Sequence, residues 1–166
     1  FAFSQGWVRQ RAATLVEITT DTGVTGWGED FTQGLETPEI AAAAIKSCFA
    51  DMLIGENPLD IERLWFDMYH RSRDFGRKGA VMAAISGIDI ALWDIRGKQE
   101  NQPVSELLGG RKRDRVLAYA TMNLLMTAAV TGNTFEEKLR AMLDQGFKAI
   151  KLSIDNFGHR DNSKSD

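Results

Sequence analysis

Few side chains in this sequence have the type and setting for chemistry, and two of them stand close together near the C-terminal end. Lys151 and Ser153 fall within a predicted strand at residues 148–154. An ammonium group can neutralise a bound carboxylate, and a serine hydroxyl can donate or accept a hydrogen bond. From the spacing alone, Lys151 is an ordinary lysine at a strand end, and Ser153 has neither the charge nor the pKa of a base.

The two histidines and the single cysteine favour structural interpretations. His70 falls in a predicted helix and reads as a surface or helix-end residue. His159 lies in a polar tail at residues 155–166, which predicts a mobile loop. Cys48 lies in an alanine-rich helical pattern, so we interpret it as buried filler. One cysteine excludes an intramolecular disulfide and suits a reducing compartment, so we expect a cytoplasmic protein.

Composition bounds the class of protein. The 166 residues are 43% hydrophobic and 26% charged, which indicates a globular chain with one sizeable core. No apolar run approaches the roughly 20 residues that span a bilayer, and no secretory signal pattern is present at the start. A net charge of −3 gives no general attraction to nucleic acid. We therefore expect neither a membrane nor a nucleic acid as a partner.

The first two thirds of the chain predict a hairpin followed by helices. Residues 11–20 and 24–29 are rich in β-branched residues and are separated by turn-forming Asp21, Thr22 and Gly23. Proline, acidic and capping residues mark the helix starts. Helices are expected at 38–52, 59–73 and 80–99, with a short helical turn at 103–108. Gly109 and Gly110 end this part, so we place a domain boundary here.

The last third of the chain predicts a different arrangement. A strand at 115–121, a helix at 134–145 and a strand at 148–154 form a βαβ pattern. Parallel strands bury both faces of a sheet, and two strands cannot achieve this alone. The second domain is therefore predicted to be incomplete.

Three stretches resemble one family, in the order in which that family carries them. Residues 84–98, Ala-Ile-Ser-Gly-Ile-Asp-Ile-Ala-Leu-Trp-Asp-Ile-Arg-Gly-Lys, continue to Pro-Val-Ser-Glu-Leu-Leu-Gly-Gly at 103–110. Together they resemble the signature stretch of the mandelate racemase/muconate lactonizing enzyme family of the enolase superfamily. Thr-Gly-Val-Thr-Gly-Trp-Gly-Glu at 22–29 resembles its capping domain, and Gly-Phe-Lys-Ala-Ile-Lys-Leu-Ser at 146–153 resembles its second barrel strand.

The resemblance implies a fold and a division of the chain. Residues 1–110 would form an α+β capping domain, a β-hairpin plus a helix bundle. Residues 111–166 would begin a modified TIM-type (β/α) barrel with its first βαβ unit. A full barrel takes about 250 residues, so the barrel would be incomplete. Homo-oligomers are also implied, because the superfamily often forms them.

The resemblance also implies a reaction. Enzymes of this family abstract the proton next to a carboxylate and stabilise the enediolate on Mg²⁺. The three acidic metal ligands of the family lie on later barrel strands, beyond Asp166, so no metal ligand is assigned within this chain. Asp89 and Asp94 fall on the signature helix, where we expect structural hydrogen bonds. The resemblance implies a small carboxylate as substrate and, within that class, favours a sugar acid.

Site residues follow from the positions that match the family. Many members carry Lys-x-Lys on the second barrel strand, with the second lysine as base, and here Lys151 is followed by Ser153. Lys151 would help neutralise the substrate carboxylate, and Ser153 would hydrogen-bond the substrate. Capping loops determine specificity in the family, so Trp7, Phe31 and Gln33 are the expected substrate contacts.

Several functions remain open at this point. The serine in place of a base lysine favours an acid-sugar dehydratase whose base lies on later strands. A racemase or epimerase, or a cycloisomerase, would use related chemistry. A non-catalytic fragment that acts only through assembly is the alternative from another class.

Overall fold

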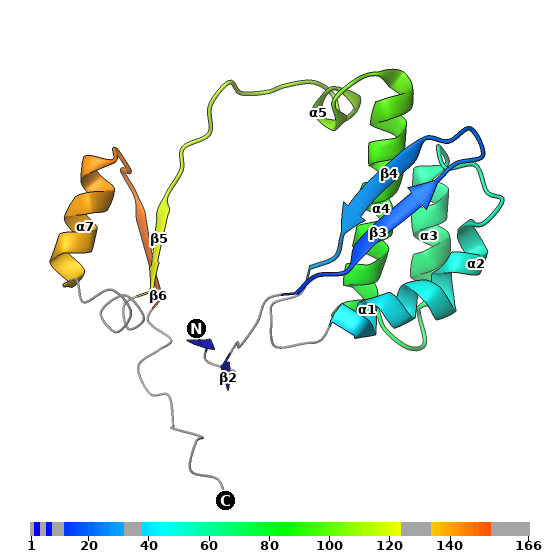
Figure 1. Ribbon diagram of the computed structural model, residues 1–166, viewed down its shortest axis with the longest axis horizontal. Helices are drawn as coiled ribbons and strands as arrows, with labels where there is room; N and C mark the ends of the chain where they lie inside the picture. The colour runs from blue at the N-terminus through cyan, green and yellow to red at the C-terminus, as the bar shows by residue number, and fades with distance from the viewer. Residues whose placement is uncertain (1, 4–5, 8–11, 32–37, 124–133, 154–166) are drawn as a thin grey trace, which may run out of the picture. The chain divides into compact units, whose positions relative to one another are not determined.

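The computed structural model describes residues 2–3, 6–7, 12–31, 38–123 and 134–153 (Figure 1). The chain separates into two compact units. One is Gln10–Lys112, called the capping unit below, and the other combines Phe1–Arg9 with Arg113–Asp166. The boundary lies two residues beyond the glycine pair at 109 and 110. Each unit is described by itself.

The capping unit begins with the expected hairpin. Strand β3 (Leu15–Thr19) pairs antiparallel with β4 (Thr25–Glu29), and the register runs from Leu15 opposite Glu29 to Thr19 opposite Thr25. The connecting turn is closed by a hydrogen bond of 2.9 Å from the Thr20 N–H to the Val24 carbonyl. Gly23 has a φ of 85°, a conformation that glycine adopts at little cost. The predicted hairpin is therefore confirmed.

Helices follow the hairpin at the predicted places. The first helical stretch is continuous but changes its winding, from α1 (Pro38–Ala44) through a π-helical segment η1 (Ile45–Phe49) to α2 (Ala50–Leu53). The others are α3 (Ile61–Arg71), α4 (Ala80–Glu100) and the short α5 (Val104–Leu107). Figure 1 shows the hairpin and the helices gathered around α4.

The core of the capping unit forms along α4. Its buried apolar residues come from β3, the first helical stretch, α3 and α4, and their burial is the main source of stability. The cluster contains Val16, Ala41, Phe49, Ile61, Leu64, Met68, Ala84, Ile85, Ile88, Ala91, Leu92 and Ile95. Cys48 packs against this cluster and is partly buried. The helices predicted at 59–73 and 80–99 therefore each turn an apolar face toward the core.

Strand β4 lies in direct backbone contact with α4 because both carry glycine. A Cβ atom added to Gly28 would lie 1.9 Å from the Gly87 carbonyl oxygen, and one added to Gly26 would lie 2.1 Å from the Ala91 carbonyl oxygen. No side chain fits in that space. The Thr-Gly-Trp-Gly-Glu pattern of β4 is thus a packing requirement.

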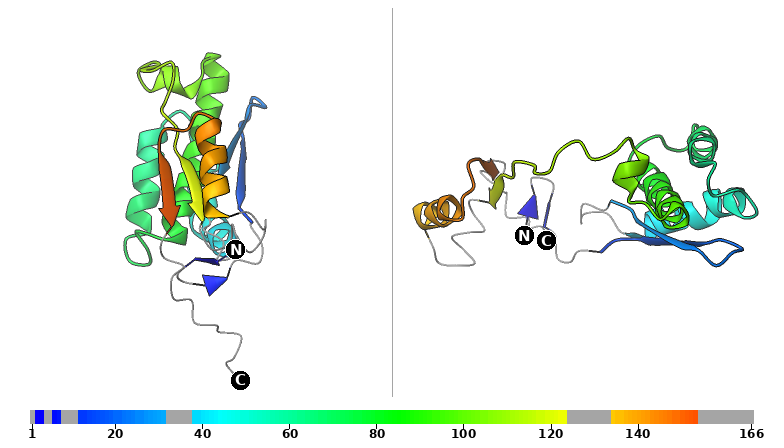
Figure 2. Two further views of the ribbon diagram at one scale, coloured as in Figure 1. Left: turned by 90° about the vertical axis from the view of Figure 1, so that its left-hand side faces the viewer. Right: turned by 90° about the horizontal axis from the view of Figure 1, so that it is seen from above.

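The second unit contains a parallel pair of strands. Strand β5 (Ala120–Asn123) pairs with β6 (Ile150–Ser153), and α7 (Phe135–Asp144) joins them in the chain (Figure 2). Helix α7 begins with a capping box, in which the Thr134 side chain accepts from the Glu137 N–H and Glu137 accepts from the Thr134 N–H. The predicted βαβ order is confirmed.

The start of the first strand was predicted wrongly. The pattern predicted a strand at 115–121, whereas the paired residues begin at Ala120. Val116 and Leu117 are 78% and 89% exposed. A strand needs a neighbour to satisfy its backbone groups, and in the described part of this unit β6 reaches only residues 120–123.

A further small ladder lies near the N-terminus. Strand β1 (Ala2–Phe3) pairs antiparallel with β2 (Gly6–Trp7). The sequence predicted only a loop there.

Among the described helices, none combines the length and apolar character needed to cross a membrane.

Candidate active-site residues and the capping scaffold

Lys151 lies on β6, with its side chain exposed to solvent. It pairs in register with Thr121 of β5, whose side chain is also exposed. Partner residues of a parallel pair project to the same face of the sheet. The pair therefore presents an ammonium and a hydroxyl on one face, a combination that can bind an anionic oxygen.

Ser153 is the last residue of β6 and pairs in register with Asn123, the last residue of β5. The two strands thus end together. In sheets of parallel strands, the carboxyl ends of the strands are where ligands bind. The backbone positions of Lys151 and Ser153 suit that role.

The three expected substrate contacts lie in different parts of the chain. Trp7 belongs to β2, and Phe31 follows β4 with 71% of its surface exposed. Gln33 lies outside the described residues. Their common role as substrate contacts stays a prediction.

Metal-binding side chains do not gather in the described parts of the two units. Among the described residues, no three histidine, cysteine, aspartate or glutamate side chains lie together in a way that could hold a metal ion. Hard divalent cations need several oxygen ligands at one point. The described residues therefore do not fit a magnesium site.

Asp94 and Lys98 hydrogen-bond the outer edge of β4. The Asp94 carboxylate accepts a hydrogen bond of 2.8 Å from the Trp27 N–H, and the Lys98 ammonium donates to the Thr25 carbonyl at 2.7 Å. Lys98 also contacts Asp94 at 2.6 Å. Desolvation by burial alone would raise the pKa of Asp94. The hydrogen bonds from Lys98 and Trp27, with the charge of Lys98, lower that pKa below its ordinary value. The expected structural role of Asp94 is confirmed.

Asp89 lies on the same helix in a different environment. It is partly buried, and desolvation by burial raises the pKa of its carboxyl.

His70 packs among the aromatic side chains of α3, stacked on Phe66 with ring centroids 6.2 Å apart. This aromatic packing agrees with the structural interpretation of His70.

Sequence reasoning did not identify the buried carboxylate at the end of β4. Asp30 is 2% exposed, and its Oδ1 accepts a hydrogen bond of 2.7 Å from the Thr14 N–H. The Thr14 hydroxyl donates to the Pro38 carbonyl at 2.7 Å. Thr14 therefore ties the end of β4 to the start of α1, on both sides of the stretch that contains Gln33. Nothing in the local sequence distinguished Asp30, which follows the acidic Glu29.

Comparison with known sequences identifies relatives of the same kind. The sequence pattern described as "Mandelate racemase / muconate lactonizing enzyme, N-terminal domain" matches residues 1–109. D-galactarolactone cycloisomerase from Agrobacterium fabrum (strain C58 / ATCC 33970) is 39% identical over 145 residues, which are 87% of this chain and 37% of the relative. D-galactonate dehydratase from Variovorax paradoxus (strain S110) is 40% identical over 140 residues, 84% of this chain and 34% of the relative.

Solved structures give the same picture. The 3,6-anhydro-D-galactonate cycloisomerase from Zobellia galactanivorans is 41% identical with a TM-score of 0.70, covering 86% of this chain and 37% of that one. A racemase from Streptomyces coelicolor A3(2) with bound magnesium is 30% identical with a TM-score of 0.70, covering 83% of this chain and 40% of that one. This chain thus spans little more than a third of the length of these relatives.

Proposed function

This chain belongs to the mandelate racemase/muconate lactonizing enzyme family of the enolase superfamily, and on that premise we propose that it forms the front part of a magnesium-dependent sugar-acid enzyme. The proposed reaction begins with abstraction of the proton next to the substrate carboxylate. The more specific proposal is an acid-sugar dehydratase. Its support is the 40% identity to a D-galactonate dehydratase, together with Ser153 at the position of the family's base lysine.

We assign residues 1–110 to the capping domain and residues 111–166 to the beginning of the barrel. The N-terminal family pattern, which covers residues 1–109, supports this assignment. So do the break between compact units after Lys112 and the parallel strands β5 and β6. The remaining strands of the barrel would come from further sequence of the protein.

Lys151 carries the electrostatic part of the proposal. Its exposed ammonium on β6 would bind the substrate carboxylate and offset the negative charge that grows as the α-proton leaves. Ser153 would add a hydrogen bond to the substrate. Because a serine hydroxyl is not a competent base, the proton must go to a side chain outside these two positions.

Magnesium would stabilise the enediolate when bound. The described residues form no metal site, so we assign none of them as a ligand and expect the ligands on later barrel strands. Trp7, Phe31 and Gln33 are proposed substrate contacts of the capping region. A cytoplasmic homo-oligomer is the proposed form of the protein.

A cycloisomerase is the second candidate function. D-galactarolactone cycloisomerase is 39% identical over a similar share of the chain, almost the same identity as the dehydratase. Both candidates need α-proton abstraction, and they differ in the leaving group and the product. Incubating the full-length protein with Mg²⁺ and either D-galactonate or D-galactarolactone separates them. Dehydration produces water and a 2-oxo acid, whereas cycloisomerisation changes the connectivity without loss of mass.

Two further measurements test the proposed function: the effect of metal removal on turnover, and the mass of the natural protein. A chelator should abolish turnover, and added Mg²⁺ should restore it. The mass of the natural protein should be larger than the 18.5 kDa of this sequence. If the natural protein has this mass and turns over no sugar acid, the non-catalytic assembly alternative takes the place of the proposed function.

A further inference from the structure

Thr14 makes hydrogen bonds to both ends of the stretch that separates β4 from α1. Its N–H donates to Asp30 Oδ1 at 2.7 Å, and its hydroxyl donates to the Pro38 carbonyl at 2.7 Å. Its carbonyl accepts a hydrogen bond of 3.1 Å from the Asp30 N–H. One residue therefore holds both the point where the chain leaves the hairpin and the point where it enters the helix.

The Asp30 carboxylate takes the place of a backbone group in the hairpin ladder. The register pairs Leu15 with Glu29, so Thr14 stands opposite Asp30 as the next pair. A hydrogen-bonded pair of an antiparallel ladder exchanges two backbone bonds. Here the Asp30 N–H donates to the Thr14 carbonyl, whereas the Thr14 N–H donates to the Asp30 side chain. The carboxylate thus keeps the two chains bonded while the backbone turns away from the ladder at Phe31.

Helix α4 packs against the backbone of Asp30. A Cβ atom added to Gly87 would lie 3.3 Å from the Asp30 nitrogen and 3.0 Å from the Val16 side chain. Packing this close leaves the backbone little room to shift. Asp30 is 2% exposed, whereas Phe31, the next residue, is 71% exposed. An exposed aromatic side chain therefore begins directly at an anchored residue.

The anchor is retained although part of it destabilises the fold. Asp30 Oδ2 is buried and has no hydrogen-bond partner within the described residues. A buried polar atom without a partner lowers the stability of the folded state. Natural proteins break such local rules mainly at functional sites. Stability alone therefore does not explain the carboxylate at this position.

We propose that Thr14 and Asp30 are positioning residues for substrate binding by Phe31. They act through the backbone, because they fix where Phe31 leaves the hairpin and so hold its exposed ring in place before the substrate binds. A contact that is already in place loses less conformational entropy on binding. The inference rests on the proposed function, in which Phe31 contacts a sugar acid.

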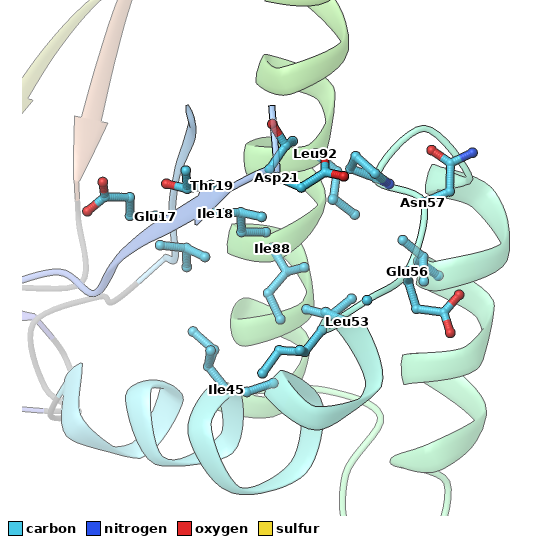
Figure 3. Close-up of a pocket in the computed structure, with 17 residues that line it drawn as sticks. Glu17, Ile18, Thr19, Asp21, Ile45, Leu53, Glu56, Asn57, Ile88 and Leu92 are labelled. Atoms are coloured by element: carbon cyan, nitrogen blue, oxygen red, sulfur yellow. The ribbon is translucent and has the colours of Figure 1, made fainter. Parts of the chain in front are cut away.

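A cleft of about 690 Å³ lies at a different surface of the hairpin (Figure 3). It is bounded by β3, by the end of the first helical stretch and by the loop before α3, and its lining includes Thr19 but neither Thr14 nor Phe31. The hydroxyl of Thr19 is hydrogen-bonded to that of Thr25 at 3.0 Å. Thr19 is therefore a matched control, a threonine of the same hairpin with a bonded hydroxyl at the other end of β3.

Steady-state kinetics separate positioning from stability. The full-length natural protein is assayed with Mg²⁺ and whichever of D-galactonate and D-galactarolactone it converts. Thr14→Val removes the hydroxyl, and it should raise KM by about tenfold or more with kcat within about twofold, because the lost contact binds ground state and transition state alike. Thr14→Ser should restore KM, and Thr19→Val should leave both constants unchanged. A loss of stability alone would lower the active fraction, and with it kcat, while KM stayed the same.

Two substitutions of Asp30 test the carboxylate in the same assay. Asp30→Ala should raise KM as Thr14→Val does, because it removes the acceptor for the Thr14 N–H. Asp30→Asn keeps an oxygen that can accept this hydrogen bond, so its KM should stay near that of the parent protein. Equal KM values for Asp30→Ala and the parent protein would overturn the role of Asp30.

A fluorine label reads the position of Phe31 without any turnover. With para-fluorophenylalanine in place of Phe31, the full-length protein should give one fluorine NMR signal. Thr14→Val should shift or split this signal, and Thr14→Ser and Thr19→Val should not. A signal unchanged in Thr14→Val, or a KM unchanged in that variant, overturns the inference. If the label responds as expected but no sugar acid is converted, the proposed function is refuted and the placement of Phe31 by Thr14 is supported.

Discussion

The Asp94 carboxylate accepts a hydrogen bond of 2.8 Å from the backbone N–H of Trp27, although 67 residues separate them in the chain. The bond joins the signature helix to the outer edge of the hairpin. Because Lys98 contacts both Asp94 and the Thr25 carbonyl, these two side chains and the two backbone groups of β4 form one connected set. Asp94 and Lys98, which belong to the signature stretch at 84–98, therefore help to hold the capping unit together.

Asp94→Asn should destabilise the capping unit by about 1–2 kcal/mol, since it weakens hydrogen bonds to a charged, partly exposed group. Urea unfolding followed by circular dichroism measures this change. Glu100→Gln is the matched control, because Arg96 and Glu100 form a pair of the same spacing that does not touch the hairpin. Equal effects of the two variants would contradict the role of Asp94.

The lowered pKa of Asp94 gives this stabilisation a pH dependence. A depressed pKa in the folded state means that the contribution is present above the ordinary value of 3.8 and is lost as the pH falls through the folded pKa. The stability difference between the wild type and Asp94→Asn should therefore shrink below about pH 4. A difference that stays constant down to acid unfolding would contradict the assignment.

Asp89 should show the opposite dependence. Burial raises its pKa above the ordinary value of 3.8, so its contribution is most favourable at low pH and is lost as the pH rises through the folded pKa. Asp89→Asn should leave stability unchanged near pH 3 and increase it by about 1 kcal/mol at pH 7. Thermal unfolding at the two pH values makes the comparison, and a variant less stable at pH 7 would oppose it.

Gly28→Ala should be severely destabilising, by about 3 kcal/mol or more, because its Cβ would lie 1.9 Å from the Gly87 carbonyl oxygen. Gly76→Ala is the control: its Cβ would meet only the Val81 side chain, at 3.0 Å. Urea unfolding of both variants gives the difference. Near-equal stabilities would show that β4 and α4 do not pack through their backbones.

Thr134→Ala should cost about 1 kcal/mol, because it removes the side chain that caps α7. The local readout is faster hydrogen exchange at Glu137, whose N–H donates to the Thr134 hydroxyl at 3.3 Å. Glu136→Gln, in the same turn but outside the capping box, should leave that amide unchanged.

Local patterns were enough to predict most elements. Ile61, Leu64 and Met68 recur at helical spacing and are buried, and Thr134 with Glu137 marks the start of α7. The π-helical segment Ile45–Phe49 was not predicted, because no glycine or proline interrupts that stretch. The start of β5 was placed too early, since apolar residues such as Leu117 are exposed in the structure.

Less of the candidate site than of the fold could be predicted from the sequence. Lys151 was found only through the family resemblance, because a lysine at a strand end has no distinguishing spacing. Contacts such as Thr14 with Asp30 and Asp94 with Trp27 join residues distant in sequence, and a one-dimensional pattern does not specify such pairings.

The most direct test of the proposed function is exchange of the substrate α-hydrogen with solvent. The full-length natural protein is incubated with D-galactonate and Mg²⁺ in D₂O and followed by NMR, alongside Lys151→Met and the neighbouring control Lys148→Met. We predict loss or exchange of the α-hydrogen, a fall of about 100-fold or more in kcat/KM for Lys151→Met, and near-normal rates for Lys148→Met. No exchange with any sugar acid, or full activity of Lys151→Met, would contradict the account.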